Sequence, residues 1–323
     1  MFSFRPFYRN RVGLVLEGGG MRGGFVAGAL MALMDKGLNS FESALAVSAS
    51  VPTLAYFAAG QRAEMERVWR QELNTSKLVC YRNIPAASFA LSAKKPILNI
   101  NYLIDDVFMK KYPLDLRRLK RSKIDCYFAV ASASEGRLTL LRPGDDNIYR
   151  IFKAALAVPG CYPGTVRVAG SGYVDGGASN ALPAGYLLNG KVKRILAILS
   201  TPLDCGREAP NLFERILFRR HFQRYEWMTT KLRESARDYN KQVGILEQLA
   251  RLAPARAFII APDKMPPARF ITRDRQKINQ TIDLGYEKVE HLEGQIRKFL
   301  TDDQQKQSLC RILNFHRRRL VRI

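Results

Sequence analysis

The chain contains no run of about 20 uncharged apolar residues, which is the length that a helix needs to cross a bilayer. Its first residues, MFSFRPFYRNR, are basic and aromatic, and they are not followed by the long apolar core of a secretory signal. Any contact with a membrane is therefore expected to be peripheral. These features predict a cytoplasmic protein, with the inner face of the membrane as the surface that it could meet.

Cysteine is scarce, and the five cysteines are scattered, odd in number and without the spacing of a zinc site. This distribution argues against a disulfide framework and against a structural metal. We expect reduced, buried thiols. The cysteines are Cys80, Cys126, Cys161, Cys205 and Cys310.

Acidic residues are also few: 29 Asp and Glu stand against 52 Lys and Arg, for a formal net charge of +23. Such an excess predicts attraction to a polyanion, either an anionic membrane surface or a nucleic acid, although a basic, solvated surface would have the same composition. Nucleic acid is the weakest of these interpretations, because the chain has no zinc-finger spacing, helix-turn-helix pattern or RNA-binding aromatic signature.

Apolar runs that read as strands alternate with apolar-periodic stretches that read as helices, which predicts an α/β fold with a mostly parallel sheet covered on both faces. Such a sheet carries its site at the carboxyl ends of the strands. At 323 residues the chain is long enough for one such domain. The expected strands are 12–16, 44–47, 126–131, 137–141, 195–199 and 257–260, and the expected helices include 25–34, 51–59, 149–157 and 181–189.

A glycine-rich segment, Gly18-Gly19-Gly20-Met21-Arg22-Gly23, follows the first strand and opens the first helix. Glycines let the backbone approach a ligand closely, and a helix N-terminus adds unpaired N–H groups with a positive dipole end. The result is a cradle for an anion, either a phosphate or the oxyanion of a transition state. A Walker loop is excluded, because no Gly-Lys-Ser/Thr follows. A nucleotide-binding loop would need an acidic residue to bind the ribose, and the sequence has no clear candidate at the expected spacing. The oxyanion interpretation requires a nucleophile close to the loop.

Ser48 is the candidate nucleophile, because it lies where the second strand turns sharply into a helix. Such a turn needs small residues two positions before and after the serine, and here they are Ala46 and Ser50 where the usual pattern has glycines. Taken alone, the pattern is explained better by a serine that caps a helix N-terminus, because such turns with small residues are common.

A serine hydroxyl needs a base, and the three histidines His221, His291 and His316 all lie in the basic C-terminal third, where surface positions explain them most simply. Asp175 is the alternative base, because it ends a short strand in the tight turn Asp175-Gly176-Gly177. Asp-Gly is also a common turn pair, so that Asp175 by itself is explained better as part of a β-turn.

The order of the three motifs resembles that of the patatin-like phospholipase family. Gly18 to Gly23 and Asp175-Gly176-Gly177 match the family's motifs completely, and the elbow matches in position and nucleophile. Two shorter segments, Ala157-Val158-Pro159-Gly160 and Asn180-Ala181-Leu182-Pro183, look like its A-x-P-x and N-x-P segments. The resemblance runs from about Val12 to Ser200 and is nearest to bacterial patatin-like esterases with a helical C-terminal part.

The resemblance implies a three-layer α/β/α sandwich and a lipid acyl hydrolase of the phospholipase A, lysophospholipase or carboxylesterase type. Ser48 would be the nucleophile and Asp175 its base, with no metal or organic cofactor. The oxyanion hole would comprise Gly18, Gly19, Gly20, Arg22 and Gly23, with Arg22 supporting the loop. Residues 1–205 would form the catalytic core, and residues 206–323 a basic helical part that completes the same domain.

The elbow departs from the family pattern at Ala46, which adds one methyl group, and at Ser50, whose side chain is expected to press the following helix away from the sheet. These departures leave open a weakened lipid-binding protein. An acyltransferase that uses the same two residues is a further alternative, because an alcohol or thiol could replace water as the acceptor.

The stretch from Asn211 to Ala250 has helical apolar spacing with many arginines and lysines between aromatic residues. An interfacial helix on an anionic membrane has this composition, and so does an amphipathic helix that packs on the core. Periodicity is the same in both cases. The apolar residues concerned are Phe213, Ile216, Leu217, Phe218, Phe222, Tyr225, Trp227 and Met228, and the cations are Arg215, Arg219, Arg220, Arg224 and Lys231.

Overall fold

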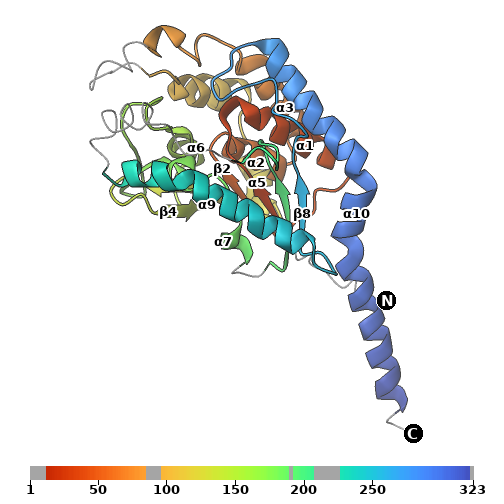
Figure 1. Ribbon diagram of the computed structural model, residues 1–323. Coiled ribbons are helices and arrows are strands. Elements are labelled where there is room, and N and C mark those ends of the chain that lie inside the picture. The colour runs from red at the N-terminus through yellow and green to blue at the C-terminus, as the bar shows by residue number, and fades with distance from the viewer. Residues whose placement is uncertain (1–11, 85–95, 189–191, 207–225, 321–323) are drawn as a thin grey trace.

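The computed structural model describes residues 12–84, 96–188, 192–206 and 226–320 (Figure 1). Eight strands form one sheet in the order β5-β6-β3-β2-β1-β7-β8, and β4 pairs with β3 beside this path. β1, β2, β3, β7 and β8 are parallel, whereas β4 and β6 run antiparallel to β3 and β5 runs antiparallel to β6. The predicted mostly parallel sheet is confirmed. The strands are β1 (Val12–Leu16), β2 (Ser43–Val47), β3 (Asp125–Ser132), β4 (Leu138–Leu141), β5 (Val166–Val168), β6 (Ser171–Asp175), β7 (Arg194–Ile198) and β8 (Ala257–Ile260).

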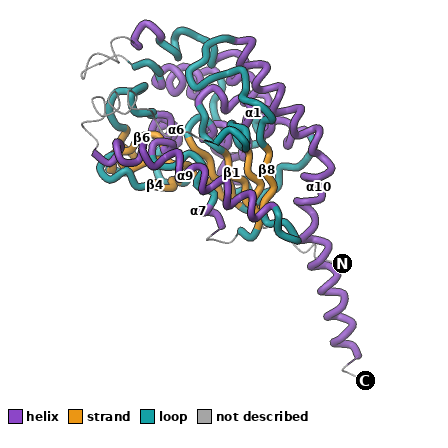
Figure 2. Tube along the Cα trace, in the orientation of Figure 1, coloured by secondary structure: helices purple, strands orange, loops and turns teal. Residues whose placement is uncertain are grey.

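Helices cover both faces of the sheet, which makes the fold the predicted three-layer α/β/α sandwich (Figure 2). Alternate residues of β1 point to opposite layers: Leu14 and Leu16 belong to the core beneath α1 and α2, while Val15 belongs to the core beneath α7 and α9. The long helix α10 packs along α1, in the layer that contains α1 and α2. The helices are α1 (Gly24–Asp35), α2 (Ser50–Ala58), α3 (Arg62–Arg67), α5 (Leu116–Arg121), α6 (Ile148–Leu156), α7 (Gly185–Leu188), α9 (Glu226–Ala250) and α10 (Arg275–Leu320), and two π-helical segments are η2 (Val68–Glu72) and η4 (Tyr102–Lys111).

The helix predicted at residues 181–189 is confirmed only at α7, Gly185–Leu188. Leu182 precedes Pro183, and a residue before proline is disfavoured in the helical region. The Leu182 amide instead donates to the Asn180 side chain at 2.9 Å, and the Ala181 carbonyl accepts from the Gly18 amide at 3.3 Å. The N-x-P segment is therefore a turn that lies against the glycine-rich loop.

The expectation of buried thiols is wrong for most of the described cysteines. Cys126 is buried, whereas Cys80 and Cys161 are half-buried and Cys205 is exposed; all four are free. Cys126 lies within β3, and the others lie in loops, where the sheet and helices do not enclose them. Cys310 lies in the part of α10 whose side chains are not described.

Two of the aromatic and apolar residues expected at a membrane surface pack on the protein instead. Met228 is 1% exposed and packs with Ala131 and Val174. The Trp227 indole donates to the Ala133 carbonyl at 2.9 Å. The start of α9 is thus an amphipathic helix docked on the core, and residues 211–225 of the same stretch lie outside the described residues. Among the described residues, no helix combines the length and apolarity needed to span a membrane.

Candidate active site

Ser48 lies on a strained turn between β2 and α2. Its φ is +56°, a left-handed conformation that residues with a side chain rarely adopt and that costs about 1–3 kcal/mol. Because β2 ends at Val47 and α2 begins at Ser50, the turn has no room to relax. This geometry is that of a nucleophile elbow, which lifts the serine hydroxyl above the carboxyl edge of the sheet.

Asp175 reaches the same level of the sheet from the opposite side of β3. It pairs with Val130, and Ser48 lies one residue beyond the pair of Val47 with Ala129. The Ser48 hydroxyl donates to Asp175 Oδ2 at 2.6 Å, and both residues are buried. Residues separated by 127 positions therefore meet because β3 spaces β2 and β6 at the right register.

The Asp175 carboxyl group is buried, and burial raises its pKa from 3.8 to about 7. Two hydrogen bonds act in the opposite direction, one from Ser48 and one from the Gly177 amide, which donates to Oδ1 at 2.6 Å. Near neutral pH both protonation states are accessible, so that the group can accept and return a proton.

The glycine-rich loop passes directly over the elbow. A Cβ on Gly18 would lie 2.9 Å from the Ser48 Cβ, so that only glycine permits this approach. Gly20 has a φ of +57°, which favours glycine, and the following Met21 amide donates to the Phe270 carbonyl at 3.1 Å.

The backbone amides of the predicted oxyanion residues differ in what they do. The Gly18 amide donates to Ala181 and the Arg22 amide donates to Gly19, whereas the amides of Gly19 and Gly20 donate to no backbone acceptor in the described ranges. Gly23 lies at the entry to α1, where a Cβ would come 3.1 Å from the Trp69 ring. The amides of Gly19 and Gly20 are therefore candidate donors to an anion.

Ser50 fits at the start of α2. Its side chain is fully buried, and the hydroxyl donates to the Glu17 carbonyl at the end of β1 at 2.7 Å. The expectation that it presses the helix off the sheet is wrong, because this hydrogen bond ties the helix to the sheet. Ala46 is likewise buried among apolar neighbours within β2.

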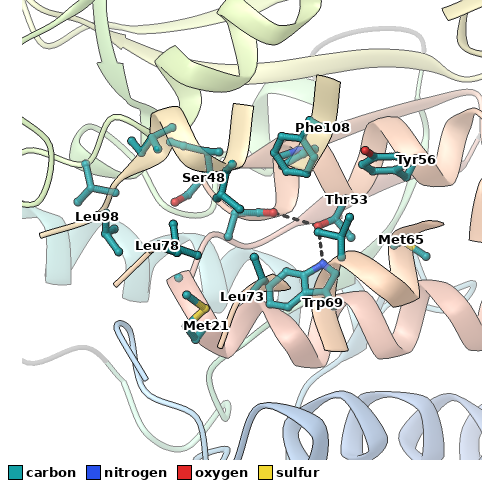
Figure 3. Close-up of a pocket in the computed structure, with 18 of the residues that line it drawn as sticks. Met21, Ser48, Thr53, Tyr56, Met65, Trp69, Leu73, Leu78, Leu98 and Phe108 are labelled. Carbon is teal, nitrogen blue, oxygen red and sulfur yellow. Dashed lines mark hydrogen bonds between the residues drawn. The ribbon is translucent and has the colours of Figure 1, made fainter. Parts of the chain in front are cut away.

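An apolar pocket opens beside Ser48, with about 710 Å³ of space when its open mouth is included. Figure 3 shows Ser48 with Leu78 and Leu98 on one side and Phe108 and Met65 on the other. The polar groups of the wall are satisfied internally, since Trp69 donates to the Thr53 hydroxyl at 3.1 Å and Thr53 donates to the Ala49 carbonyl at 2.9 Å. Such a wall suits a hydrocarbon chain better than a polar ligand.

Residues 14–188 match the family model described as patatin-like phospholipase. The chain belongs to this family. Its members are lipid acyl hydrolases, and a serine held between a glycine-rich loop and an apolar pocket agrees with that general activity.

Two further similarities were found. The chain is 28% identical over 203 residues to an uncharacterized Escherichia coli K12 protein, YjjU, in an alignment that covers 62% of this chain and 55% of that protein. The crystal structure of VipD from Legionella pneumophila is similar at 13% identity and a TM-score of 0.48, covering 87% of this chain and 66% of that one. The chain thus spans less than two thirds of the length of either protein.

Several residues around this patatin-like site were missed from the sequence. The Glu17 carboxylate is fully buried and accepts from the Ser200 amide at 2.6 Å and from the Thr201 hydroxyl at 3.0 Å, which joins the ends of β1 and β7. Phe270 lies outside the matched residues, yet it lines the pocket and holds the glycine-rich loop. Ala49 could have been predicted from the sequence as an oxyanion donor, since the backbone amide of the residue after such a nucleophile commonly has this role.

The described histidine lies on the surface. His291 is exposed on α10, with its Nδ1 2.9 Å from the Glu287 carbonyl. His221 and the side chain of His316 lie outside the described residues.

Proposed function

We propose that this patatin-like protein hydrolyses acyl esters of phospholipids or lysophospholipids, with Ser48 as nucleophile and Asp175 as its proton acceptor. The observation that carries the proposal is the 2.6 Å hydrogen bond from the Ser48 hydroxyl to a buried Asp175. It lies beside the apolar pocket and beneath a glycine-rich loop.

In the first half of the reaction, Ser48 Oγ attacks the acyl carbonyl carbon while its proton passes to Asp175. The tetrahedral intermediate then collapses, the bond to the leaving oxygen breaks, and Asp175 returns the proton to that oxygen. The products are a lysolipid or alcohol and an acyl group bound to Ser48.

In the second half, Asp175 is ionised again and takes a proton from water, whose oxygen attacks the acyl-serine. Collapse of the second intermediate releases the fatty acid, and the proton returns to Ser48. One carboxylate therefore performs both proton transfers, and a pKa of about 7 suits it to both directions.

The oxyanion of both intermediates would be held by the amides of Gly19 and Gly20, with the Ala49 amide at the start of α2 as a third donor. Amides fixed by the fold do not need to reorient as charge develops, which is why such donors lower the barrier. The Phe270 carbonyl supports this function by anchoring the loop through Met21.

Labelling with a fluorophosphonate tests the nucleophile. The reagent is expected to modify Ser48, because this hydroxyl is hydrogen-bonded to a base and lies beside the pocket. Digestion and mass spectrometry of the labelled protein locate the adduct. Denatured protein, in which Ser48 and Asp175 are separated, is the control and should take up no label; an adduct elsewhere, or none, contradicts the assignment.

The pocket predicts a preference for longer acyl chains. Burial of a methylene contributes about 0.8 kcal/mol, so that kcat/KM should rise about fourfold per methylene from the acetate to the octanoate of p-nitrophenol. Val68→Phe places a ring into the pocket and should lower the octanoate-to-acetate ratio at least tenfold. Leu252→Phe, at an exposed position, is the control. An equal ratio in all three proteins would exclude the pocket as the acyl site.

We further propose that the net charge of +23 attracts the protein to an anionic membrane surface, on the cytoplasmic face and without insertion.

We also propose that residues 206–323 belong to the same domain as the core. This is supported by β8, which extends the sheet next to β7, and by α10, which packs along α1.

A further inference from the structure

A basic recess is lined in part by residues of α6 and η4, two segments that also line the apolar pocket. It encloses about 820 Å³ with its open mouth included. Three cations line it, Arg150, Lys153 and Arg167, together with the polar side chains of Tyr162 and Thr165. Cations and hydroxyl groups thus converge on one concavity, which is the donor set that binds phosphate oxygens.

The positive charge of the recess is only partly neutralised. None of its lining residues is acidic. Arg150 pairs with Asp146 at 3.4 Å, but Lys153 and Arg167 make no ion pair with any residue that the structure describes. Lys153 is half-buried, so that its charge is less screened than that of a fully exposed lysine.

The recess and the apolar pocket share their walls. On α6, Leu156 lines the pocket and Lys153, one turn earlier, lines the recess. On η4, Phe108 lines the pocket and its neighbour Met109, which is 50% exposed, lines the recess. The two sites therefore adjoin along the same two helical segments, so that one lipid could place an acyl chain in the pocket and a charged group in the recess.

We infer that this recess binds a phosphate group, either the phosphate of a lipid headgroup or a soluble phosphate. Arg167 supplies a planar fork of donors and Lys153 a point charge, while the hydroxyls of Tyr162 and Thr165 supply neutral hydrogen bonds. Binding of the phosphate group does not require hydrolysis at Ser48.

The test is a calorimetric titration of the full-length Ser48→Ala protein, which prevents turnover, with inorganic phosphate and with monomeric dihexanoyl phosphatidate. In the same background, the double substitution Lys153→Gln and Arg167→Gln should weaken phosphate or phosphatidate binding at least tenfold, because it removes the two cations of the recess that have no acidic partner among the described residues. Unchanged melting temperature shows that the fold is intact.

The matched control is Arg117→Gln with Lys120→Gln on α5, which removes the same charge from exposed positions near the amino end of β3. This control should leave binding unchanged. Tighter binding of phosphatidate than of inorganic phosphate, together with no binding of dihexanoylglycerol, identifies the lipid headgroup; equal or tighter binding of inorganic phosphate identifies a soluble phosphate.

Two results would overturn the inference: no binding of either phosphate compound at millimolar concentration, or an equal loss in the control, which would indicate attraction to net charge alone. Neither result bears on ester hydrolysis. Conversely, failure of Ser48 to react with esters would remove the proposed function and leave this titration interpretable.

Discussion

Replacement of Ser48 by alanine is expected to lower kcat/KM for p-nitrophenyl butyrate by at least about 1000-fold, the scale seen when an enzyme loses its nucleophile. The loss follows because no described side chain other than Ser48 is hydrogen-bonded to Asp175. Initial rates with purified protein measure it. Alanine leaves the strained turn in place, so that the change acts on chemistry more than on the fold.

Ser134→Ala is the matched control, because Ser134 is an exposed serine outside the site. It should retain the wild-type rate and fluorophosphonate labelling. Equal rates in wild type, Ser48→Ala and Ser134→Ala would show that Ser48 is not the nucleophile.

Replacement of Asp175 by asparagine is expected to abolish hydrolysis and at the same time to stabilise the fold at neutral and alkaline pH. Asparagine cannot take the serine proton, but its amide oxygen can still accept the hydrogen bond from Gly177. The substitution also removes a buried negative charge. A gain in stability with a loss of activity distinguishes a functional carboxylate from a structural one.

The pH dependence follows from the raised pKa. Between pH 3.8 and about pH 7, Asp175 is protonated in the folded state but ionised in the unfolded state. The free energy of unfolding therefore falls as pH rises through this window. The full effect, reached above pH 7, is on the order of 4 kcal/mol, because a pKa difference of one corresponds to about 1.36 kcal/mol. The Asp175→Asn protein should lack this loss.

Urea unfolding of wild type and Asp175→Asn at pH 4.5 and pH 8 measures the difference. The stabilisation should be large at pH 8 and small at pH 4.5, and wild-type activity should rise with pH through about 7 as Asp175 ionises. A variant that is less stable than wild type at pH 8 would show that the buried carboxylate is held by interactions stronger than its desolvation cost.

Many of the strands and helices could be predicted from local sequence patterns. The strand expected at 44–47 is β2, and the one expected at 257–260 is β8, because buried parallel strands are short apolar runs that turns delimit. Three-residue β5 is too short to show alternation, and η4 carries charged residues that hide its apolar face. For the helix expected at 181–189, a proline overrode the apolar pattern.

Local sequence patterns were enough to identify the residue types that could do chemistry and their order along the chain: a glycine-rich loop, a serine after a strand, and an aspartate before two glycines. The positions of the three histidines, all in the basic C-terminal third, also argued against a histidine as the base. These are local properties, carried by a few neighbouring residues.

Whether these residues meet depends on how the strands pair and pack. The 2.6 Å contact of Ser48 with Asp175 depends on the register of β2, β3 and β6, and the raised pKa of Asp175 depends on burial by the whole surrounding fold. The roles of Phe270 and Glu17, and the fit of Ser50, likewise follow from contacts between segments distant in the chain. Such contacts leave no local pattern, because distance and desolvation are properties of the packed chain.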